Sequence, residues 1–330
     1  MKKYLLESFG GPEVLQLKDH PTPDCPADGY LVEARAMGLN FAETVERRGE
    51  YSRGQKCPFE IGKEAAGVVV AAGPQTSRFQ VGDEVIVIKF SNGCYSEIIV
   101  ANDNQLLEPP RGLSWNERAA FANTFGTAWF ALQEIARVRA GESALVQAAA
   151  GGVGTATVML AKALGMGPII GTAGTDEKCA LVESHGADAC VNYTSHDFRD
   201  KARELTEGLG VDYCIESVGG EVYDRSLELL APLGRMVIIG FSSIRDNYAE
   251  AIPRLHPLTV FHRSITVGGL NVDNIKYHHR RANWAELVTF AEKHDIRPHI
   301  GNVFAFDDAA GAHTCLERRQ SVGKVVLSVA

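Results

Sequence analysis

A glycine-rich turn between a short apolar run and a helical pattern constrains the fold of this chain most strongly. Residues 144–154 read Ala-Leu-Val-Gln-Ala-Ala-Ala-Gly-Gly-Val-Gly, which has the spacing of a G-x-G-x-x-G motif with alanine at its first position. The turn follows a buried-strand pattern and precedes a helical pattern that starts at Thr155. Backbone amides at such a turn approach a pyrophosphate, and the positive end of the helix attracts it. We therefore expect a dinucleotide to bind at Ala149, Gly151, Gly152, Val153 and Gly154.

The chain around this turn alternates between strand and helix patterns. Strands are predicted over 144–148, 168–172, 189–192, 211–216, 235–240 and 264–268, and helices over 155–164, 176–185, 197–206 and 221–230. This alternation is typical of a parallel sheet with helices on both faces. The expected fold class is therefore α/β, with a Rossmann-like, doubly wound sheet.

The residues before and after this region have a different character. Short strand patterns broken by Gly, Pro and Asp run to about residue 120 and predict an irregular β-barrel or sandwich, with strands over 30–36, 66–71 and 85–88. Two helices are predicted over 115–122 and 127–137. The tail carries helix patterns at 283–294 and 307–318 and strand patterns at 302–304 and 323–328.

The end of the second strand of the alternating region indicates which nucleotide binds. Enzymes that use NAD normally place an acidic residue there to accept the ribose 2′-hydroxyl. The sequence Thr172-Ala173-Gly174-Thr175 has no acid at this tip, and Asp176 comes only afterwards. Lys178 and the hydroxyls of Thr172 and Thr175 are suited to a 2′-phosphate, so we predict NADPH rather than NADH.

Composition excludes several classes of protein. The formal net charge of −8 and the lack of a Lys/Arg stripe argue against a nucleic-acid partner. No stretch approaches the roughly 20 apolar residues that span a bilayer, and the first residues do not form a signal sequence. The seven cysteines are scattered and show no metal or redox spacing. We therefore expect a cytoplasmic protein without a membrane or nucleic-acid partner.

With these motifs in place, the chain resembles the zinc-free quinone oxidoreductase (zeta-crystallin-like) group of the medium-chain dehydrogenase/reductase family. The resemblance rests on residues 10–15, 38–44, 62–69, 148–154 and 322–327 and covers nearly the whole chain. It implies a GroES-like catalytic domain over 1–122 and 266–330, interrupted by a Rossmann-like NADPH-binding domain over 123–265. It also implies a homodimer.

The resemblance also implies individual site residues. Asn40 matches an asparagine at the nicotinamide and substrate end of the site, and Tyr51 matches an active-site tyrosine. Thr127 matches a threonine near the nicotinamide ribose, and Lys178 and Tyr193 match groups on the adenosine phosphate. A loop that lines the cofactor corresponds to Phe241, Ser242 and Ser243. Arg319 matches an arginine that reaches back from the tail, although the adjacent Arg318 leaves this alignment open by one position.

A zinc alcohol dehydrogenase is the main alternative within the family. Its catalytic zinc needs three protein ligands, and zinc members have Cys near position 40 and His in a Gly-His-Glu stretch. This chain has Asn40 and Lys63 at those places, and it lacks four closely spaced cysteines for a structural zinc. We therefore expect no metal.

Without a metal, the accessible chemistry is hydride delivery from nicotinamide C4 to a quinone or an α,β-unsaturated carbonyl. Asn40 is predicted to orient the acceptor or the nicotinamide amide, and Tyr51 to donate a hydrogen bond or a proton. Two alternatives stay open. One is a 2-alkenal or enoyl reductase with little quinone activity, and the other is an NADPH-binding protein without catalysis.

Overall fold

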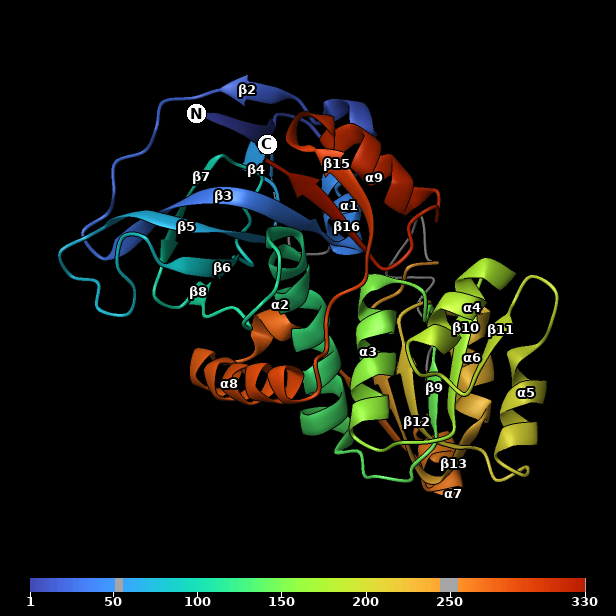
Figure 1. The fold of residues 1–330 in the computed structure, drawn as a ribbon. Helices are drawn as coiled ribbons and strands as arrows, with labels where there is room; N and C mark the ends of the chain where they lie inside the picture. The colour runs from blue at the N-terminus through green and yellow to red at the C-terminus, as the bar shows by residue number, and fades with distance from the viewer. Residues whose placement is uncertain (51–55, 244–254, 330) are drawn as a thin grey trace. The chain divides into compact units, whose positions relative to one another are not determined.

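The computed structural model describes residues 1–50, 56–243 and 255–329, and it divides into two compact units (Figure 1). Unit 1 contains Met1–Asn123 and Tyr277–Ala330, and unit 2 contains Thr124–Lys276. The first boundary lies within one residue of the predicted one. The second lies after residue 276 instead of 265, because strand β14 (Thr266–Gly269) is hydrogen-bonded to β13 (Leu230–Ile238) in the sheet of unit 2.

Unit 2 contains a six-stranded parallel sheet in the order β11-β10-β9-β12-β13-β14. The remaining strands are β9 (Ala144–Val146), β10 (Ile169–Ala173), β11 (Ala189–Asn192) and β12 (Val211–Glu216). The strand order reverses between β9 and β12. In open α/β sheets this reversal places the ligand crevice at the carboxyl ends of the strands, so loops after these strands form the candidate site.

The helices of unit 2 are α3 (Gly152–Ala163), α4 (Asp176–Ser184), α5 (Phe198–Leu205), α6 (Gly220–Glu228) and α7 (Pro257–Arg263). Right-handed crossovers place helices on opposite faces when the strand order runs outward in both directions. In agreement, α3 packs on β9 and β10, whereas Phe198 of α5 and Tyr223 of α6 share one buried apolar cluster with Leu145 and Ile170. The predicted doubly wound arrangement is therefore present.

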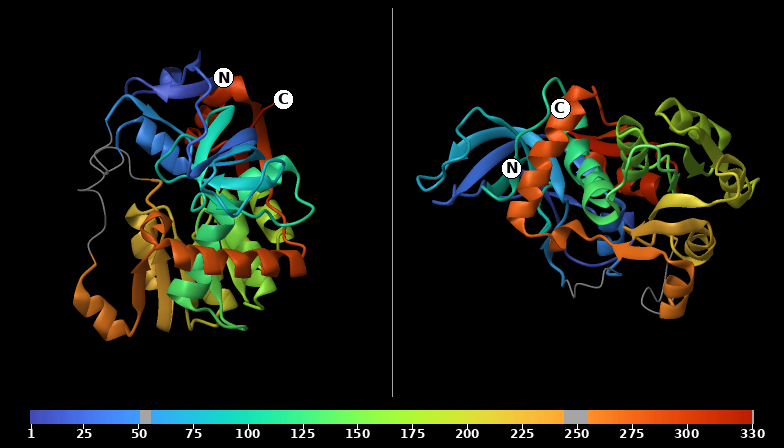
Figure 2. Two further views of the ribbon diagram at one scale, coloured as in Figure 1. Left: turned by 90° about the vertical axis from the view of Figure 1, so that its left-hand side faces the viewer. Right: turned by 90° about the horizontal axis from the view of Figure 1, so that it is seen from below.

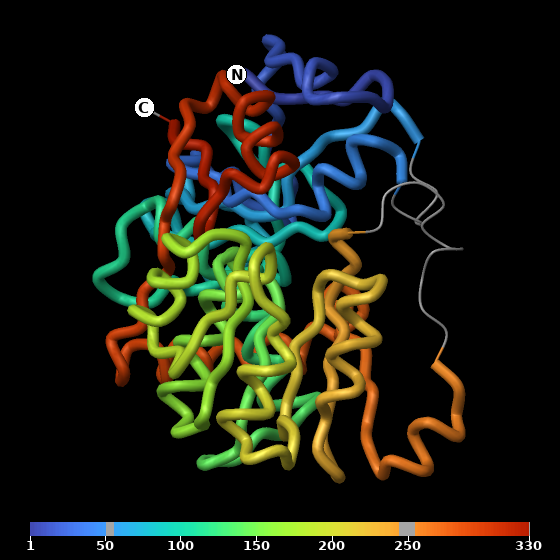
Figure 3. Tube along the Cα trace, turned by 90° about the vertical axis from the view of Figure 1, so that its right-hand side faces the viewer, coloured from blue at the N-terminus to red at the C-terminus, as the bar shows by residue number. Residues whose placement is uncertain are grey.

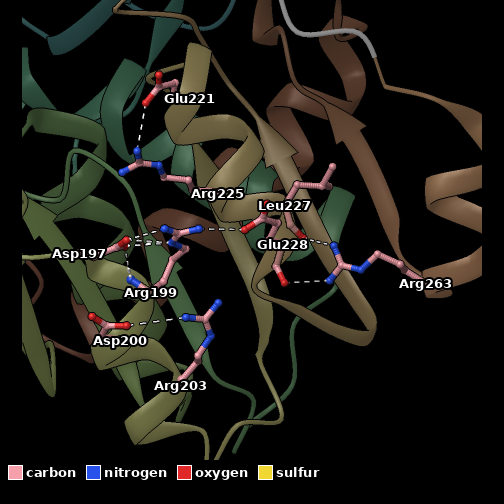
Figure 4. Close-up of polar contacts among 9 residues, drawn as sticks. All are labelled: Asp197, Arg199, Asp200, Arg203, Glu221, Arg225, Leu227, Glu228 and Arg263. Carbon is pink, nitrogen blue, oxygen red and sulfur yellow. Dashed lines mark hydrogen bonds and ion pairs between the residues drawn. The ribbon is translucent and has the colours of Figure 1, made fainter.

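Ion pairs connect α5 and α6 on the surface of unit 2, and hydrogen bonds connect α6 and α7 (Figure 4). Arg199 pairs with Asp197, the N-cap residue of α5, and with Glu228 of α6. The side-chain hydrogen bond from Arg199 lowers the pKa of Asp197 to about 2. Arg263 of α7 donates to the main-chain oxygens of Leu227, Glu228 and Leu230, and so provides partners at the carboxyl end of α6.

Unit 1 is built on a larger sheet in the order β15-β16-β3-β5-β6-β8, with β7 also paired to β3, and on a small sheet in the order β2-β1-β4. These strands are β1 (Lys2–Leu6), β2 (Leu17–Asp19), β3 (Gly29–Leu39), β4 (Phe59–Glu60), β5 (Glu64–Ala72), β6 (Glu84–Ile88), β7 (Ile98–Asn102), β8 (Leu106–Leu107), β15 (Ile300–Ala305) and β16 (Lys324–Ser328). Because β16 pairs antiparallel with β3, the C-terminal chain lies beside the N-terminal chain, as Figure 3 shows. This pairing explains why one unit contains both ends of the sequence.

Helices α1 (Phe41–Arg47), α8 (Tyr277–Lys293) and α9 (Ala309–Glu317) belong to unit 1, and Figure 2 shows α8 as a long orange helix. Trp284 of α8 packs edge-on against Phe121, and its indole N–H donates to the main-chain oxygen of Glu108 at 3.1 Å. The carboxyl end of β3 lies close to helix α2 (Trp115–Trp129), because a Cβ on Gly38 would lie 2.1 Å from the Ala119 main-chain oxygen. No helix in the described part of the chain is long and apolar enough to cross a bilayer.

The helix that links the two units differs from the prediction. Two helices were expected, over 115–122 and 127–137, but α2 runs without interruption over Trp115–Trp129 and continues as a π-helix over Phe130–Ala136. The predicted gap included Gly126, a weak helix former. Burial of Thr124, Phe125 and Ala128 holds these residues in the helix despite that preference.

Candidate functional site

The glycine-rich turn places an open helix N-terminus at the carboxyl end of β9. Gly151 is the N-cap residue of α3 and no side chain caps the helix. The Thr155 hydroxyl donates back to main-chain oxygens of Gly151 and Gly152, and the Thr155 N–H makes the first intrahelical bond, to the Gly151 oxygen at 2.9 Å. The amides of Gly152, Val153 and Gly154 precede that bond. They form an anion site of the kind expected for a pyrophosphate.

Two glycines of the turn have different physical roles. A Cβ on Gly154 would lie 2.4 Å from the Ala148 oxygen and 2.6 Å from the Ala149 Cα, so main-chain atoms exclude any side chain there. A Cβ on Gly151 would meet the Ala148 oxygen at an ordinary 3.4 Å. Gly154 is therefore required by the packing of α3 against the main chain of the turn, whereas a side chain at Gly151 would meet only an ordinary contact. These residues fit a dinucleotide pyrophosphate.

Thr172 has a different role from the predicted one. It is buried, and its hydroxyl donates to Gln147 Oε1 at 2.6 Å and accepts from the Ala148 N–H at 3.3 Å. The Gln147 amide in turn donates to Ser226 Oγ at 2.8 Å. The side chain points into the protein, so Thr172 supports the turn and does not face a nucleotide phosphate.

Three other predicted residues lie in or near the segment after β10. A Cβ on Gly174 would lie 2.8 Å from Tyr193 Oη, so Tyr193, which is 45% exposed, lies close above this glycine. Lys178 lies in the first turn of α4 and is half-buried. The Thr175 hydroxyl accepts from the Lys178 N–H at 3.3 Å as the N-cap of that helix. Asp176 accepts a hydrogen bond from Asn192 Nδ2 at 2.8 Å, which holds its carboxylate against β11.

Phe241, Ser242 and Ser243 follow β13 at the same edge of the sheet. The Ser242 N–H donates to the Ser217 oxygen, and both the N–H and the hydroxyl of Ser243 donate to the Val218 oxygen. These bonds join the loop after β13 to the loop after β12. The predicted residues of this loop thus lie beside the other strand ends.

The sequence reasoning missed Glu216, which organises the loop after β12. Its buried carboxylate accepts from the Val218 N–H at 2.8 Å and from the Gly219 N–H at 3.1 Å. Burial raises the pKa of Glu216, and these hydrogen bonds oppose that shift. An acidic residue directly after the apolar run Tyr213-Cys214-Ile215 was the available signal.

The remaining predicted residues lie elsewhere. Thr127 is half-buried in α2. Arg319 is exposed after α9 in unit 1, where it has a φ of 56°. Tyr51 lies outside the described residues.

Asn40 is the centre of a buried polar group in unit 1, here named the Asn40 cluster. The cluster consists of Asn40, Glu43, Glu64, Asn123 and Lys324. Asn40 Nδ2 donates to Glu43 Oε1 at 3.2 Å and to Glu64 Oε1 at 3.1 Å. Asn40 Oδ1 accepts from Lys324 Nζ at 2.7 Å and from Asn123 Nδ2. A carboxamide has two donor hydrogens and two acceptor positions, so this side chain has no hydrogen-bonding position left for a ligand.

This saturation corrects the predicted role of Asn40. The sequence suggested that its amide touches the acceptor or the nicotinamide, but the residue is only 8% exposed and its amide is fully used by the protein. Asn40 also caps α1 through a capping box with Glu43. The sequence could not show that Lys324 and Glu64, far away along the chain, form an ion pair beside it.

A second buried chain of polar groups adjoins the Asn40 cluster. Tyr95 Oη donates to Glu43 Oε2 at 2.6 Å and lies 3.3 Å from His313 Nε2. Burial raises the pKa of Glu43, although the Tyr95 hydrogen bond opposes this shift. Burial lowers the pKa of His313 to about 3, and the nearby Arg47 contributes to the shift. His313 is therefore a neutral imidazole at pH 7.

Lys63 occupies the position at which zinc members of the family carry a histidine ligand. Lys63 is buried and its ammonium lies 2.8 Å from Glu46 Oε1, also buried. A cation in this place opposes a divalent metal, and Asn40 has no free ligand atom. Among the described residues, no group of three or more His, Cys, Asp and Glu side chains has metal-site geometry.

Comparison with known proteins shows the same two-part organisation. The family model described as Alcohol dehydrogenase GroES-like domain matches residues 26–140, and the one described as Zinc-binding dehydrogenase matches residues 152–293. A Quinone oxidoreductase of Pseudomonas aeruginosa is 34% identical over 99% of both chains. A human Quinone oxidoreductase is 31% identical over 99% of this chain and 97% of its own.

Solved structures agree with this assignment. A mycobacterial protein complexed with NADPH has a TM-score of 0.90 and 31% identity, covering 99% of this chain and 100% of its own. An Escherichia coli quinone oxidoreductase complexed with NADPH has a TM-score of 0.89 and 28% identity with the same coverage. An NAD-dependent alcohol dehydrogenase has a TM-score of 0.88 and 30% identity over the whole of both chains. The predicted combination of a GroES-like and a Rossmann-like domain is confirmed, and the chain belongs to the quinone oxidoreductase group of the medium-chain dehydrogenase/reductase family.

Proposed function

We propose that this protein is an NADPH-dependent oxidoreductase that reduces a quinone or an α,β-unsaturated carbonyl without a metal. The open N-terminus of α3, with Gly154 packed against the main chain of the turn, is the observation that carries the proposal. The relatives named quinone oxidoreductases and the NADPH complexes among similar structures support it. When bound, NADPH supplies the hydride.

Most of the residues proposed to hold the nucleotide follow strand ends of unit 2. The amides of Gly152, Val153 and Gly154 receive the pyrophosphate, and Gly151 and Ala149 belong to the turn that holds these amides. Gly174, Lys178 and Tyr193 surround the adenosine end, while Thr172 acts from below by fixing the turn. Phe241, Ser242 and Ser243 are proposed to line the cofactor, and the resemblance to the family also assigns Thr127 and Arg319 to it.

The proposed preference for NADPH rests on charge at the end of β10. Asp176 is held toward Asn192, and no acidic residue occupies the tip at 172–175. Lys178 supplies the cation for the 2′-phosphate. We expect Lys178→Ala to raise the Kd of NADPH about tenfold or more and to leave the Kd of NADH nearly unchanged. Equal dissociation constants for the two nucleotides in the parent protein would contradict the preference.

The chain's own groups position the acceptor and stabilise charge on its oxygen. Tyr51 is proposed to donate a hydrogen bond or a proton to that oxygen, and Tyr51→Phe tests this by its turnover with each acceptor. The lysine–glutamate pair at Lys63 and the saturated Asn40 support a reaction without zinc. Stoichiometric zinc in active protein would contradict this part of the proposal.

One assay decides between the reductase and its alternatives. NADPH oxidation is followed by absorbance with a quinone and a 2-alkenal in parallel. Turnover with quinone supports the proposal, whereas turnover with the alkenal alone identifies a 2-alkenal reductase. Binding of NADPH without any turnover identifies a non-catalytic binding protein.

We also propose a homodimer in the cytoplasm. The outer edge of β14 has no partner strand among the described residues, and α7 beside it exposes Leu258 and Phe261. Such an edge pairs readily with a second copy. Light scattering of the parent protein and of Phe261→Asp measures this, and a monomeric parent would exclude the dimer. Free thiols at all seven cysteines are consistent with the proposed compartment.

A further inference from the structure

Two half-buried polar positions stand out on helix α2 and the residues that follow it. From Ala119 to Leu132 every residue is buried except Asn123 and Thr127. These two residues are four positions apart and therefore share one face of the helix. Within residues 119–132, only these two polar side chains are partly accessible to solvent or to a ligand.

The Asn40 cluster fixes which way the Asn123 amide points. Asn40 Oδ1 accepts from the Lys324 ammonium at 2.7 Å, so this atom is the oxygen and its second partner must be a donor. Asn123 therefore directs Nδ2 toward Asn40. Its main-chain N–H is also held, by Glu64 Oε2 at 2.9 Å.

This orientation leaves two hydrogen-bonding positions of the half-buried Asn123 side chain unused. Its Oδ1 and its second Nδ2–H have no hydrogen-bond partner among the described residues, in contrast to the four filled positions of Asn40. Asn123 is therefore the carboxamide of this cluster that can meet a ligand. Asn40, Lys324 and Glu64 hold it in place and act as positioning residues.

We propose that Asn123 is a substrate-contacting residue whose second Nδ2–H donates to the carbonyl oxygen of the quinone or enone acceptor. The inference rests on the proposed function. Reduction adds a hydride to an acceptor carbon while the nicotinamide is oxidised. The π-electron pair moves onto the carbonyl oxygen, and a proton from solvent then gives the saturated carbonyl or, for a quinone, the keto tautomer of the hydroquinone. That tautomer becomes the hydroquinone when the ring CH2 loses a proton and the second carbonyl oxygen gains one. A fixed N–H donor stabilises the oxygen as its charge grows, and it does so without reorganisation at that moment.

The experiment uses the full-length protein with Asn123→Ala and Asn123→Ser. We expect kcat/KM for 1,4-benzoquinone or for a 2-alkenal, whichever the parent protein reduces, to fall about tenfold to a hundredfold. Most of the loss should lie in kcat, because the interaction strengthens as charge develops. The Kd of NADPH, measured by fluorescence titration, should stay within twofold of the parent value. Asn104→Ala, a change at an exposed turn asparagine, is the matched control and should leave every value unchanged.

Each other result has a separate meaning. A parent protein that reduces no quinone and no enone overturns the proposed function itself, and the inference with it. A parent with turnover and Asn123 variants with full kcat/KM overturn only the inference. It also falls if NADPH affinity drops in the same proportion, because Asn123 then contacts the nucleotide. A loss that appears only together with loss of folded protein in thermal melts likewise rejects the contact with substrate.

Discussion

Replacing Lys324 by methionine tests whether charge holds the Asn40 cluster together. The side chain of Lys324 is 4% exposed, and that of its partner Glu64 is fully buried. Breaking a buried ion pair by removing one partner costs about 3–5 kcal/mol, because the other charge is left uncompensated. Glu64 keeps hydrogen bonds from Asn40 Nδ2 at 3.1 Å and from the Asn123 N–H at 2.9 Å. We therefore expect the lower end, a loss of about 3 kcal/mol in the free energy of unfolding.

A double-mutant cycle separates the charge from the packing. Glu64→Gln alone leaves the Lys324 ammonium without its counter-ion and should cost a similar amount. The double variant Lys324→Met/Glu64→Gln carries no buried charge at this pair. Its cost should therefore stay about 2–3 kcal/mol below the sum of the two single losses.

Urea unfolding at pH 7.5, followed by circular dichroism, measures these free energies. Thermal melts should show Lys324→Met about 6–12 °C below the parent protein, at 2–4 °C for each kcal/mol. Lys201→Met removes an exposed pair with Glu204 and should change the free energy of unfolding by no more than about 0.5 kcal/mol. A Lys324→Met loss as small as this control, or additive values in the cycle, would refute the reasoning.

Two further predictions concern His313 and the glycine turn. The pKa of His313 is about 3 in the folded protein, against an ordinary value of 6.5. As pH falls, the unfolded chain therefore binds a proton at this histidine before the folded protein does. The contribution of neutral His313 to the free energy of unfolding is complete above pH 6.5 and is lost progressively down to pH 3. At pH 5.0 this loss is about 2 kcal/mol. The urea midpoint of the parent protein should therefore fall more between pH 7.5 and 5.0 than that of His313→Gln, which has no imidazole to protonate. Equal falls for the two proteins would disprove the assignment. Gly154→Ala should lower the melting temperature strongly, because its Cβ would meet a main-chain oxygen at 2.4 Å, whereas Gly151→Ala should melt like the parent protein and lose NADPH affinity. Thermal melts and NADPH titrations of both variants measure this. A Gly154→Ala protein that melts like the parent would contradict the prediction.

Local patterns were sufficient to predict most of unit 2. The six strands of its sheet lie where alternation indicated them, because parallel buried strands and their crossover helices are each specified over a few residues. The glycine turn was equally local. Propensity misled the prediction only where burial outweighed it, as at Gly126 inside α2.

The Asn40 cluster could not be predicted in the same way. Lys324 contacts Asn40 across 284 residues, and this contact exists because β16 pairs with β3. Nothing in the Gly323-Lys324-Val325 segment distinguishes a buried lysine from an exposed one at the start of a strand. Thr172 shows the converse error. Its hydroxyl suited a phosphate by position, but the direction of the side chain is set by the strand and turns it toward Gln147.

Two buried lysines of unit 1 occupy places that are incompatible with a bound zinc ion, and each lysine is stabilised by a buried glutamate. Lys63 alone would be an uncompensated buried cation, and Glu46 compensates it. Glu64 alone would be an uncompensated buried anion, and Lys324 compensates it. Because Lys324 also occupies Asn40 Oδ1, changing Lys63 to histidine by itself would supply one ligand atom and leave the neighbouring oxygens bound to an ammonium. The residues at positions 40, 64 and 324 therefore depend on one another, because the Lys324 ammonium pairs with Glu64 and fixes which atom of Asn40 accepts.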